Sequence, residues 1–444
     1  MILLLGCAPS PGDSGELARL AGDSVASHGA RDEEELRLPE ELVSDGGLLS
    51  ATLVAGALGE GYGYNGASPG PTLRASVGDT VEVRLDNQLD DSTTIHWHGM
   101  SVPNEMDGVS FVVDPVDPGS SFQYRFTADR AGTFWYHPHV DVSRQVDLGL
   151  YGVVVVGDAA EPVAERDLVL VFDAAGELDA DAAHDDEGHH HALPDPRDTT
   201  WLVNGQVAPT LRLAAGERAR ARLLNASNTA YLSLDWPGAR LVAGEQGLLG
   251  AEGVVDGLLL APGQRAEVEI DAGIGDHEVT TAMWTAWGGA AYGDPVVLLQ
   301  VIDEGGAAAP LDFAFAGAAP TADPAHTDLV YTFQGGAAGE DWLINGEAWP
   351  DVTPAVLALG AEYIVEARNL SSTNHPFHLH GFALELLSVN GDPPAVATRG
   401  DTFDIPIRAT VRMRLLADNP GSWALHCHLL GHEDHGMMTV VEVR

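Results

Sequence analysis

Lysine is absent from this sequence of 444 residues, so arginine accounts for all 22 of its permanently cationic side chains. Asp and Glu together number 66, and the formal net charge at neutral pH is -44. A surface of this charge repels nucleic acid and anionic lipid headgroups, which excludes nucleic acid as a partner. It attracts metal cations and cationic substrates, although solubility is the simpler reason for such acidity.

Cysteine is also scarce, with one residue near each end of the chain. Cys7 ends the segment LLGC, which follows an apolar run from Met1 and resembles a bacterial lipoprotein signal, although no basic residue precedes the run. Residues 1–45 are interpreted as such a signal and a flexible tether, with a frayed, unmodified N-terminus as the alternative. We expect an extracytoplasmic protein, periplasmic or at the cell surface, that contacts a membrane only through a lipid on Cys7. A lipidated Cys7 would leave Cys427 without a disulfide partner.

Three stretches of the sequence resemble one another: residues 64–87, 203–227 and 344–371. Each contains Asn-Gly, a proline, a glycine turn, an alternating apolar strand and a final Asn. The Asn-Gly pairs lie about 140 residues apart, which is the size of a domain rather than of a solenoid repeat.

Short apolar strands separated by Gly, Pro, Asn and Asp dominate each repeat, and helical periodicity is weak. We therefore expect an all-β fold of three consecutive β-sandwich domains. The domains are predicted at 46–160, 161–305 and 306–444, with linkers near 158–167 and 303–312. A low-complexity, His-rich insert at 179–198 is expected to be a loop of the middle domain.

Histidine is concentrated in four short motifs: HWHG (96–99), WYHPH (135–139), HPFHLHG (375–381) and HCHLLGH (426–432). The first two lie in the first repeat and the last two in the third. Residues i and i+2 of a strand point to the same face. Four His-X-His pairs can therefore place eight imidazoles around one point, whereas the side chain of Cys427 points to the opposite face of its strand.

The types of ligand indicate the metal. Two imidazoles, one thiolate and a weak thioether are the ligand set of a mononuclear blue copper site. Zinc more often takes additional thiolates or a carboxylate, and Mg or Ca takes oxygen ligands, so a cluster of imidazoles also favours copper. Cys427 lies between His426 and His428, and an electron can cross from one copper site to the other through this short covalent bridge.

Taken together and in this order, the four motifs resemble those of the multicopper oxidase family, which includes laccases and bacterial cuprous oxidases, over residues 46–444. The resemblance implies three cupredoxin-like Greek-key domains and four coppers per chain: one type 1, one type 2 and two type 3. It implies His375, Cys427, His432 and axial Met437 as type 1 ligands, and His96 and His378 as type 2 ligands. The type 3 ligands that it implies are His98, His137, His139, His380, His426 and His428.

The same resemblance implies the reaction. A reductant, either a phenolic or aromatic compound or a metal ion, gives single electrons to the type 1 copper, and O2 is reduced to water at the trinuclear cluster. Asp107 and Glu433 match acidic positions that supply protons in bacterial relatives. Asp401 and Asp404 are further acids, but nothing in their spacing selects them. A two-domain nitrite reductase is excluded by the three repeats and by the HCH motif. We expect a monomer.

A copper-tolerance or copper-binding protein, with Cu(I) oxidation or copper sequestration as its main role, is the alternative function. His184, His189, His190 and His191 of the insert are accessory metal ligands in that interpretation. A solvated loop without function is the simpler interpretation of the insert. The chain has only seven methionines and no methionine cluster, which counts against a dedicated Cu(I) oxidase.

Overall fold

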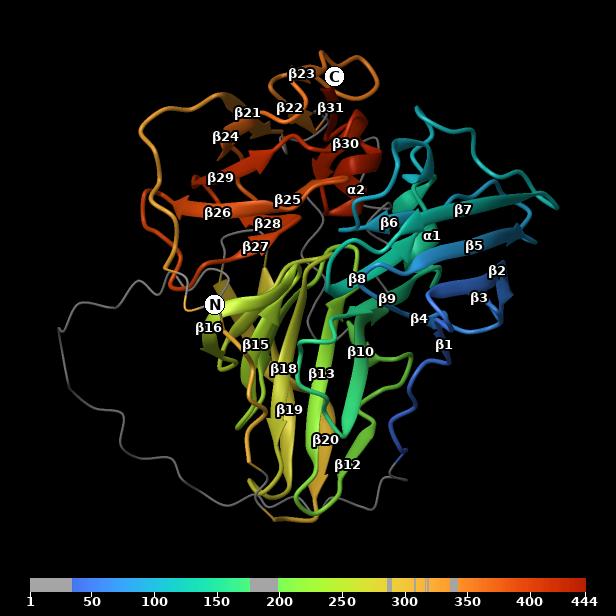
Figure 1. Cartoon of the computed structure of the whole chain (residues 1–444), viewed down its shortest axis with the longest axis vertical. Helices are drawn as coiled ribbons and strands as arrows, with labels where there is room; N and C mark the ends of the chain where they lie inside the picture. Colours follow the sequence, from blue (N-terminus) through green and yellow to red (C-terminus); the bar gives the residue numbers. More distant parts are fainter. Residues whose placement is uncertain are drawn as a thin grey trace.

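The computed structural model describes residues 34–175, 199–285, 290–306, 309–315, 317, 319–335 and 342–444. Within these ranges the regular secondary structure is almost entirely β-strand, with short helical segments only at η1, α1 and α2. Three groups of strands follow one another along the chain, and each group consists of two sheets (Figure 1). The all-β sandwich architecture expected from the sequence is confirmed.

The first group forms one sheet in the order β3-β2-β5-β7 and a second in the order β1-β4-β9-β8-β6. Its elements are β1 (Glu41–Val43), β2 (Leu48–Leu58), β3 (Gly61–Tyr64), β4 (Thr72–Ser76), β5 (Thr80–Asn87), β6 (His96–His98), η1 (Asn104–Met106), β7 (Ser121–Thr127), β8 (Gly132–His137), α1 (Val142–Asp147) and β9 (Gly152–Gly157).

The middle group has the sheet orders β11-β10-β13-β18-β15-β16 and β12-β20-β19-β14-β17. Its strands are β10 (Arg166–Ala175), β11 (Thr200–Val203), β12 (Thr210–Leu213), β13 (Arg218–Asn225), β14 (Tyr231–Asp235), β15 (Arg240–Gly244), β16 (Gly247–Val254), β17 (Leu258–Leu260), β18 (Arg265–Asp271), β19 (His277–Thr285) and β20 (Ala290–Asp303).

The third group has the orders β22-β21-β24-β29-β26-β27 and β23-β31-β30-β25-β28. Its elements are β21 (Leu329–Gln334), β22 (Leu343–Ile344), β23 (Ala355–Leu357), β24 (Glu362–Asn369), β25 (His375–Leu379), β26 (Leu384–Val389), β27 (Arg399–Gly400), β28 (Thr402–Ile405), β29 (Thr410–Leu416), β30 (Gly421–Cys427), α2 (Leu430–Asp434) and β31 (Met438–Val443).

The three sequence repeats occupy equivalent turns. The asparagines of the Asn-Gly pairs, Asn65, Asn204 and Asn345, all have positive φ, which Asn tolerates better than most residues. In each turn the Asn side chain accepts from one main-chain N–H of the neighbouring strand and donates to the carbonyl two residues earlier on that strand. The repeated residue type therefore corresponds to one repeated tertiary contact.

Two continuous apolar runs mark the contact between the first and middle groups. Along β9, Val154 and Val156 join the core of the first group, whereas Val153 and Val155 join a separate cluster that includes β10 residues Val169 and Val171. Both faces of these strands are thus buried, which explains why their sequences do not alternate with polar residues. Each fully buried aliphatic side chain contributes about 1.5–3 kcal/mol, so this interface fixes the two groups firmly.

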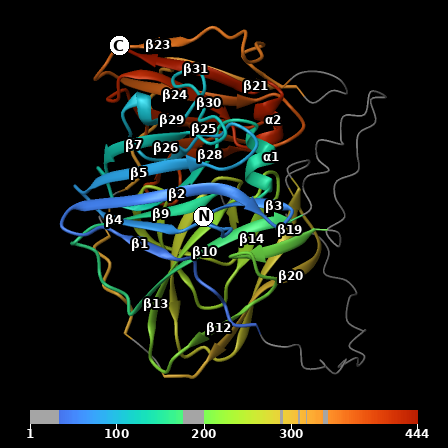
Figure 2. The ribbon, with the colours of Figure 1, turned by 90° about the vertical axis from the view of Figure 1, so that its right-hand side faces the viewer.

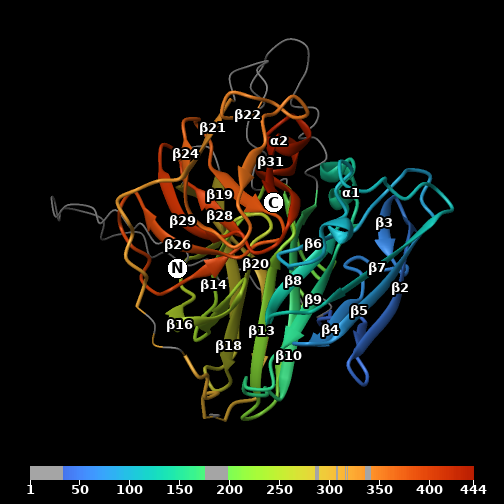
Figure 3. The same ribbon diagram turned by 45° about the horizontal axis from the view of Figure 1, so that its top comes forward.

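The first and third groups also lie against each other. In Figure 2 the first group lies in front of the boundary between the third group and the middle group, and Figure 3 shows β6 and β8 next to the C-terminal strands. Buried residues of the first and third groups, including Trp97 and Phe377, belong to one apolar cluster. Helices α1 and α2 are in contact at the same boundary.

The N-terminal segment differs from expectation where the structure describes it. Residues 34–45 fall in the predicted flexible tether, but β1 pairs in parallel with β4, and Leu36 N–H donates to the Thr210 carbonyl at 2.8 Å. These main-chain bonds attach the segment to the first and middle groups, so the tether prediction is wrong for this part. Cys7 lies outside the described residues. Among those residues, none of the helices has the length and apolar character needed to cross a membrane.

Candidate metal centre

Two strand pairs, one from the first group and one from the third, carry the four histidine motifs. β6 runs antiparallel to β8, with His96 opposite His137. β25 runs antiparallel to β30, with His378 opposite His426 and Phe377 opposite Cys427. His139, His380 and His428 follow the ends of β8, β25 and β30. Strand pairing thus aligns the motifs two by two, and the contact between the groups brings the two pairs together.

All eight imidazoles of the His-X-His pairs are buried around one centre. The His96 and His380 rings stack with their centroids 3.7 Å apart, and the His98 and His378 rings do the same at 3.7 Å. His139 lies 5.3 Å from His426, and His137 lies 5.8 Å from His428, between ring centroids. The described residues that contribute these rings come from the first and third groups only.

In most of these rings one nitrogen makes a hydrogen bond that fixes the orientation of the ring. Nδ1 of His96 lies 3.0 Å from the Asp107 carbonyl, Nδ1 of His137 lies 2.8 Å from the Pro138 carbonyl, and Nδ1 of His378 lies 3.0 Å from the Asp401 carbonyl. A carbonyl only accepts, so it selects the tautomer that carries its hydrogen on that nitrogen. The lone pair is then on the other ring nitrogen.

Buried ring nitrogens without a hydrogen-bond partner among the described residues show what this centre can bind. They are His96 Nε2, His98 Nδ1, His137 Nε2, His139 Nε2, His378 Nε2 and both nitrogens of His428. A buried polar atom left unpaired costs about 1–3 kcal/mol, so a cluster of them calls for a ligand. Ligand atoms of His96, His378 and His380, and of His139, His380 and His426, lie within 4.8 Å of one another. The donor set fits metal ions that prefer imidazole.

Burial also keeps most of these imidazoles neutral. It lowers the pKa of His98, His137, His378 and His380 well below the ordinary value of 6.5. The pKa of His139 falls to about 4 and that of His428 to about 3, again chiefly through burial. For His426, burial lowers the pKa, but the Glu433 carboxylate together with the Cys427 carbonyl and Asp107 outweighs it, and the net pKa is raised. Neutral imidazoles offer the lone pairs that a metal needs at neutral pH.

Cys427 forms a second site on the opposite face of β30. Its Sγ lies 3.4 Å from Nδ1 of His375 and 3.6 Å from Nδ1 of His432. Met437 is fully buried in the same apolar cluster, and its carbonyl accepts from the Cys427 N–H at 3.1 Å. Burial raises the pKa of the Cys427 thiol well above its ordinary range. A thiolate here therefore needs a cation beside it, and a metal ion held by two imidazoles supplies one.

Two carboxylates border the larger cluster. Asp107 is fully buried, with Oδ2 2.9 Å from His380 Nδ1 and Oδ1 3.2 Å from His96 Nδ1. Glu433 lies on α2, with Oε2 2.9 Å from His426 Nδ1 and Oε1 3.3 Å from His139 Nε2. Burial opposes ionisation of Glu433, but His426 and His139 outweigh it and lower its pKa to about 2. Both predicted proton carriers thus contact histidines of the cluster.

Other residues within or beside the four motifs are placed as follows. Trp97, Trp135 and Trp423 are buried, and Met438 is in the core. His435 is exposed, and its Nδ1 lies 2.6 Å from the Gly431 carbonyl. The insert histidines, His184, His189, His190 and His191, lie outside the described residues.

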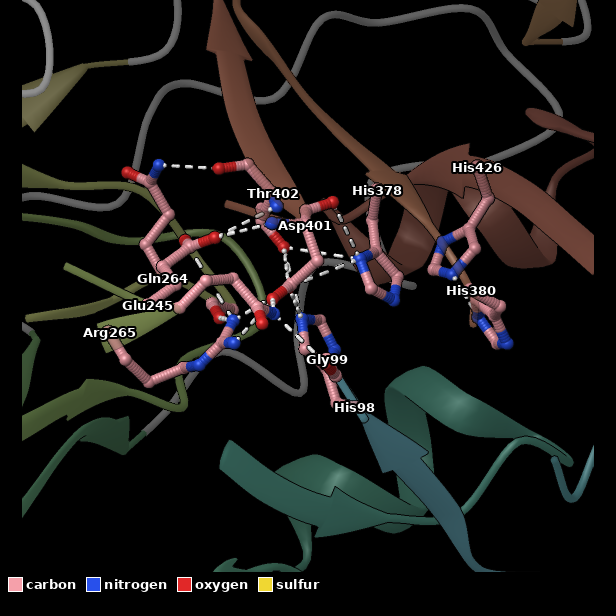
Figure 4. Close-up of polar contacts among 12 residues, drawn as sticks. His98, Gly99, Glu245, Gln264, Arg265, His378, His380, Asp401, Thr402 and His426 are labelled. Atoms are coloured by element: carbon pink, nitrogen blue, oxygen red, sulfur yellow. Dashed lines mark hydrogen bonds and ion pairs between the residues drawn. The ribbon is translucent and has the colours of Figure 1, made fainter. Parts of the chain in front are cut away.

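Sequence reasoning missed several residues beside the two sites. The indole of Trp342 stacks on the His432 ring with the centroids 3.6 Å apart, and Ser371 Oγ lies 2.7 Å from His375 Nε2. Two residues of the middle group contact Asp401: Arg265 forms an ion pair with its carboxylate, and Glu245 accepts a hydrogen bond from its N–H (Figure 4). No motif spacing indicates these contacts. Each is made by a single residue that belongs to none of the four histidine motifs.

Comparisons with known proteins agree with this geometry. Residues 50–161 and 321–444 each match a family model described as multicopper oxidase. The chain is 30% identical to the multicopper oxidase MmcO of Mycobacterium tuberculosis, over 98% of this chain and 93% of the relative. It is 29% identical to laccase-4 of Trametes villosa, over 85% of this chain and 84% of the relative. A solved multicopper oxidase of Campylobacter jejuni, described as a metallo-oxidase, superposes with a TM-score of 0.77 at 26% identity, over 93% of this chain and 98% of the other.

Proposed function

Because this chain belongs to the multicopper oxidase family, it is an oxidase that uses O2 as acceptor and binds four coppers, and we propose which of its residues hold them. His375, Cys427 and His432 hold the type 1 copper, with Met437 as the axial group. His96 and His378 hold the type 2 copper. The type 3 pair is held by His98, His137, His139, His380, His426 and His428.

One observation carries this proposal: Cys427 and its two neighbours face different sites from the same strand. The Cys427 sulfur lies beside His375 and His432, and the flanking His426 and His428 belong to the larger cluster. Only one residue of main chain separates the sulfur from each of these imidazoles. When bound, copper accepts single electrons at the first site and reduces O2 to water at the second. The Cys427 side chain and its adjacent peptides provide the electron path between them.

Proton supply is assigned to the two carboxylates that border the cluster. Asp107 presents Oδ2 to His380 and Oδ1 to His96, and Glu433 presents its oxygens to His426 and His139. A carboxylate in this position accepts a proton from water and passes it toward the reacting oxygen. Both groups are buried, so this route requires water molecules between each carboxylate and the solvent.

The organisation of the whole chain is part of the same proposal. Cupredoxin-like domains span residues 46–160, 161–305 and 306–444, and the first and third supply the copper ligands. The two-sheet groups β2–β9, β10–β20 and β21–β31 support these boundaries, and β1 (Glu41–Val43) adds a strand to the first domain ahead of residue 46. We further propose an extracytoplasmic location, periplasmic or at the cell surface, with a lipid on Cys7 and a monomeric state.

The surroundings of His432 favour an aromatic reductant. The ring is partly exposed, and the buried Trp342 indole stacks on it, so a partly exposed imidazole with an apolar aromatic backing lies beside Cys427. An aromatic donor packs against such an exposed ring at a centroid separation of about 4.5–7 Å. The absence of a methionine cluster removes the soft ligands that a cuprous ion prefers.

An oxygen electrode tests the reductant directly. Copper-loaded protein is supplied in turn with a phenolic dye, Cu(I), Fe(II) and Mn(II), and the oxygen consumption of the heat-inactivated protein is subtracted. We expect steady consumption of O2 with the phenol. Consumption with Cu(I) alone would contradict the aromatic assignment and would favour the copper-tolerance function.

A further inference from the structure

A buried ion pair joins the copper-free middle group to the histidine cluster. Arg265 begins β18, Asp401 lies between β27 and β28, and both side chains are fully buried. Nη1 and Nη2 of Arg265 donate to Oδ1 and Oδ2 of Asp401 at 2.8 and 2.6 Å. This is the forked geometry in which a guanidinium fixes both the position and the plane of a carboxylate. Figure 4 shows the pair beside His98 and His378.

Asp401 contacts two histidines of the cluster, one through its side chain and one through its main chain. Its Oδ1 lies 2.9 Å from Nε2 of His98, and its carbonyl lies 3.0 Å from Nδ1 of His378. The nitrogens left without a partner among the described residues are then Nδ1 of His98 and Nε2 of His378. Thr402 Oγ1 lies 3.0 Å from the same His98 nitrogen and 3.2 Å from the same His378 nitrogen. Asp401 and the adjacent Thr402 therefore determine together which nitrogen each ring offers to a metal.

The middle group also holds the main chain at Asp401. Glu245, which follows β15, accepts with Oε2 from the N–H groups of Asp401 and Thr402 at 2.8 and 3.0 Å. β15 and β18 are neighbours in one sheet, so a single sheet restrains both the carboxylate and the peptide of Asp401. Arg265 additionally donates from Nε to the Thr133 carbonyl on β8 at 2.9 Å. Arg265 thus connects all three groups.

Gly99 provides the space for this ion pair. It follows His98 directly and has a φ of +85°. A Cβ at this position would lie 2.5 Å from Nη2 of Arg265 and 2.6 Å from Oδ2 of Asp401, closer than real Cβ contacts. The glycine that ends the HWHG motif is therefore required by the approach of Arg265 and Asp401 as well as by its own backbone conformation.

We propose that Arg265 is a positioning residue for the trinuclear copper site: it holds Asp401 so that His98 and His378 present Nδ1 and Nε2 to the metal. This inference rests on the ligand roles proposed above for those two histidines. His378 is one of only two ligands assigned to the type 2 copper, so that copper depends most strongly on Arg265. Loss of the guanidinium leaves a buried carboxylate without its cation, with only the neutral donors Gln246 Nε2 and Thr402 Oγ1 on its oxygens besides the His98 ring, so its position between the two rings is less firmly fixed.

The test compares Arg265→Gln with Arg222→Gln. Arg222 on β13 is also buried and pairs with Asp167 at 2.7 and 2.9 Å and with Glu267 at 2.8 Å, so both variants lose a buried guanidinium. Copper per chain is measured after dialysis against a graded chelator, and the type 2 copper is followed by electron paramagnetic resonance. We expect Arg265→Gln to lower the affinity for type 2 copper by about 10–100-fold and to change its hyperfine splitting. The blue type 1 absorption, and the type 2 signal of Arg222→Gln, stay as in the wild type.

Two further variants cover the case in which Arg265→Gln does not fold. Arg265→Lys keeps the positive charge but cannot form the two parallel hydrogen bonds of a guanidinium, and we expect a smaller loss of affinity for type 2 copper. Gly99→Ala keeps both Arg265 and Asp401 but pushes them apart with its added methyl group. It is also expected to lower the affinity for type 2 copper. Wild-type affinity and hyperfine splitting in these variants would overturn the role of Arg265. A wild-type protein without type 2 copper would instead refute the ligand assignment itself.

Discussion

Cys427→Ser is expected to abolish the blue colour and to reduce oxidase turnover by more than about 10–100-fold. That range is typical when a residue that supports a metal ligand is removed, and here the ligand itself is removed. Serine cannot supply a thiolate, so the type 1 copper loses the charge-transfer band and the first atom of the electron path. The histidines of the larger cluster face the other side of β30, and their copper is expected to remain.

The measurements are visible absorption, copper per chain and oxygen consumption with a phenolic dye. Cys7→Ser is the matched control because it makes the same substitution at the other cysteine of the sequence, which is not among the proposed copper ligands. Substrate oxidation at the wild-type rate in Cys427→Ser would show that electrons reach the cluster by another route.

Asp107→Asn is expected to slow turnover with O2 by about 10²–10⁴-fold, the range typical of a lost general acid or base. The amide keeps the size of the side chain but cannot carry a proton between water and the cluster. Electron entry does not depend on this group, so the type 1 copper should still bleach rapidly when reductant is added without O2. Stopped-flow absorption in the absence of O2, followed by mixing with O2, separates the two steps.

A control variant and a copper assay make this result specific. Asp114→Asn changes an exposed acid a few residues away and should turn over as the wild type does. Because Asp107 also contacts His380 and His96, copper per chain is measured in parallel to show that the site remains loaded. A normal turnover rate for Asp107→Asn across the pH range would move the proton path elsewhere, with Glu433 the next candidate.

Patterns in short stretches of sequence correctly predicted the direction of side chains along a strand and the equivalence of the three repeats. The period of two along a strand was sufficient to place Cys427 opposite its neighbouring histidines. The repeated Asn-Gly pairs indicated three equivalent units, because each asparagine makes the same bonds to a neighbouring strand. The uninterrupted valines of β9 did not reveal their partner, since an apolar strand buried on both faces does not identify what covers it.

Contacts between distant single residues could not be predicted in the same way. Arg265 and Asp401 come from different repeats, and a lone arginine at the start of a strand resembles any surface arginine. The stacking of Trp342 on His432 likewise depends on how β22 and α2 are brought together. Residues 34–45 have the composition of a tether, but their main chain bonds to two strand groups, a contact that side-chain patterns do not encode.

Copper content is the most direct test of the central claim that two sites on one strand hold a type 1 copper and a trinuclear cluster. Protein loaded with copper and freed of loosely bound metal is analysed by inductively coupled plasma mass spectrometry, together with its visible spectrum. We predict about four coppers per chain and a blue protein, as this set of ligands supports. A single copper per chain, or zinc in place of copper in the loaded protein, would contradict the claim.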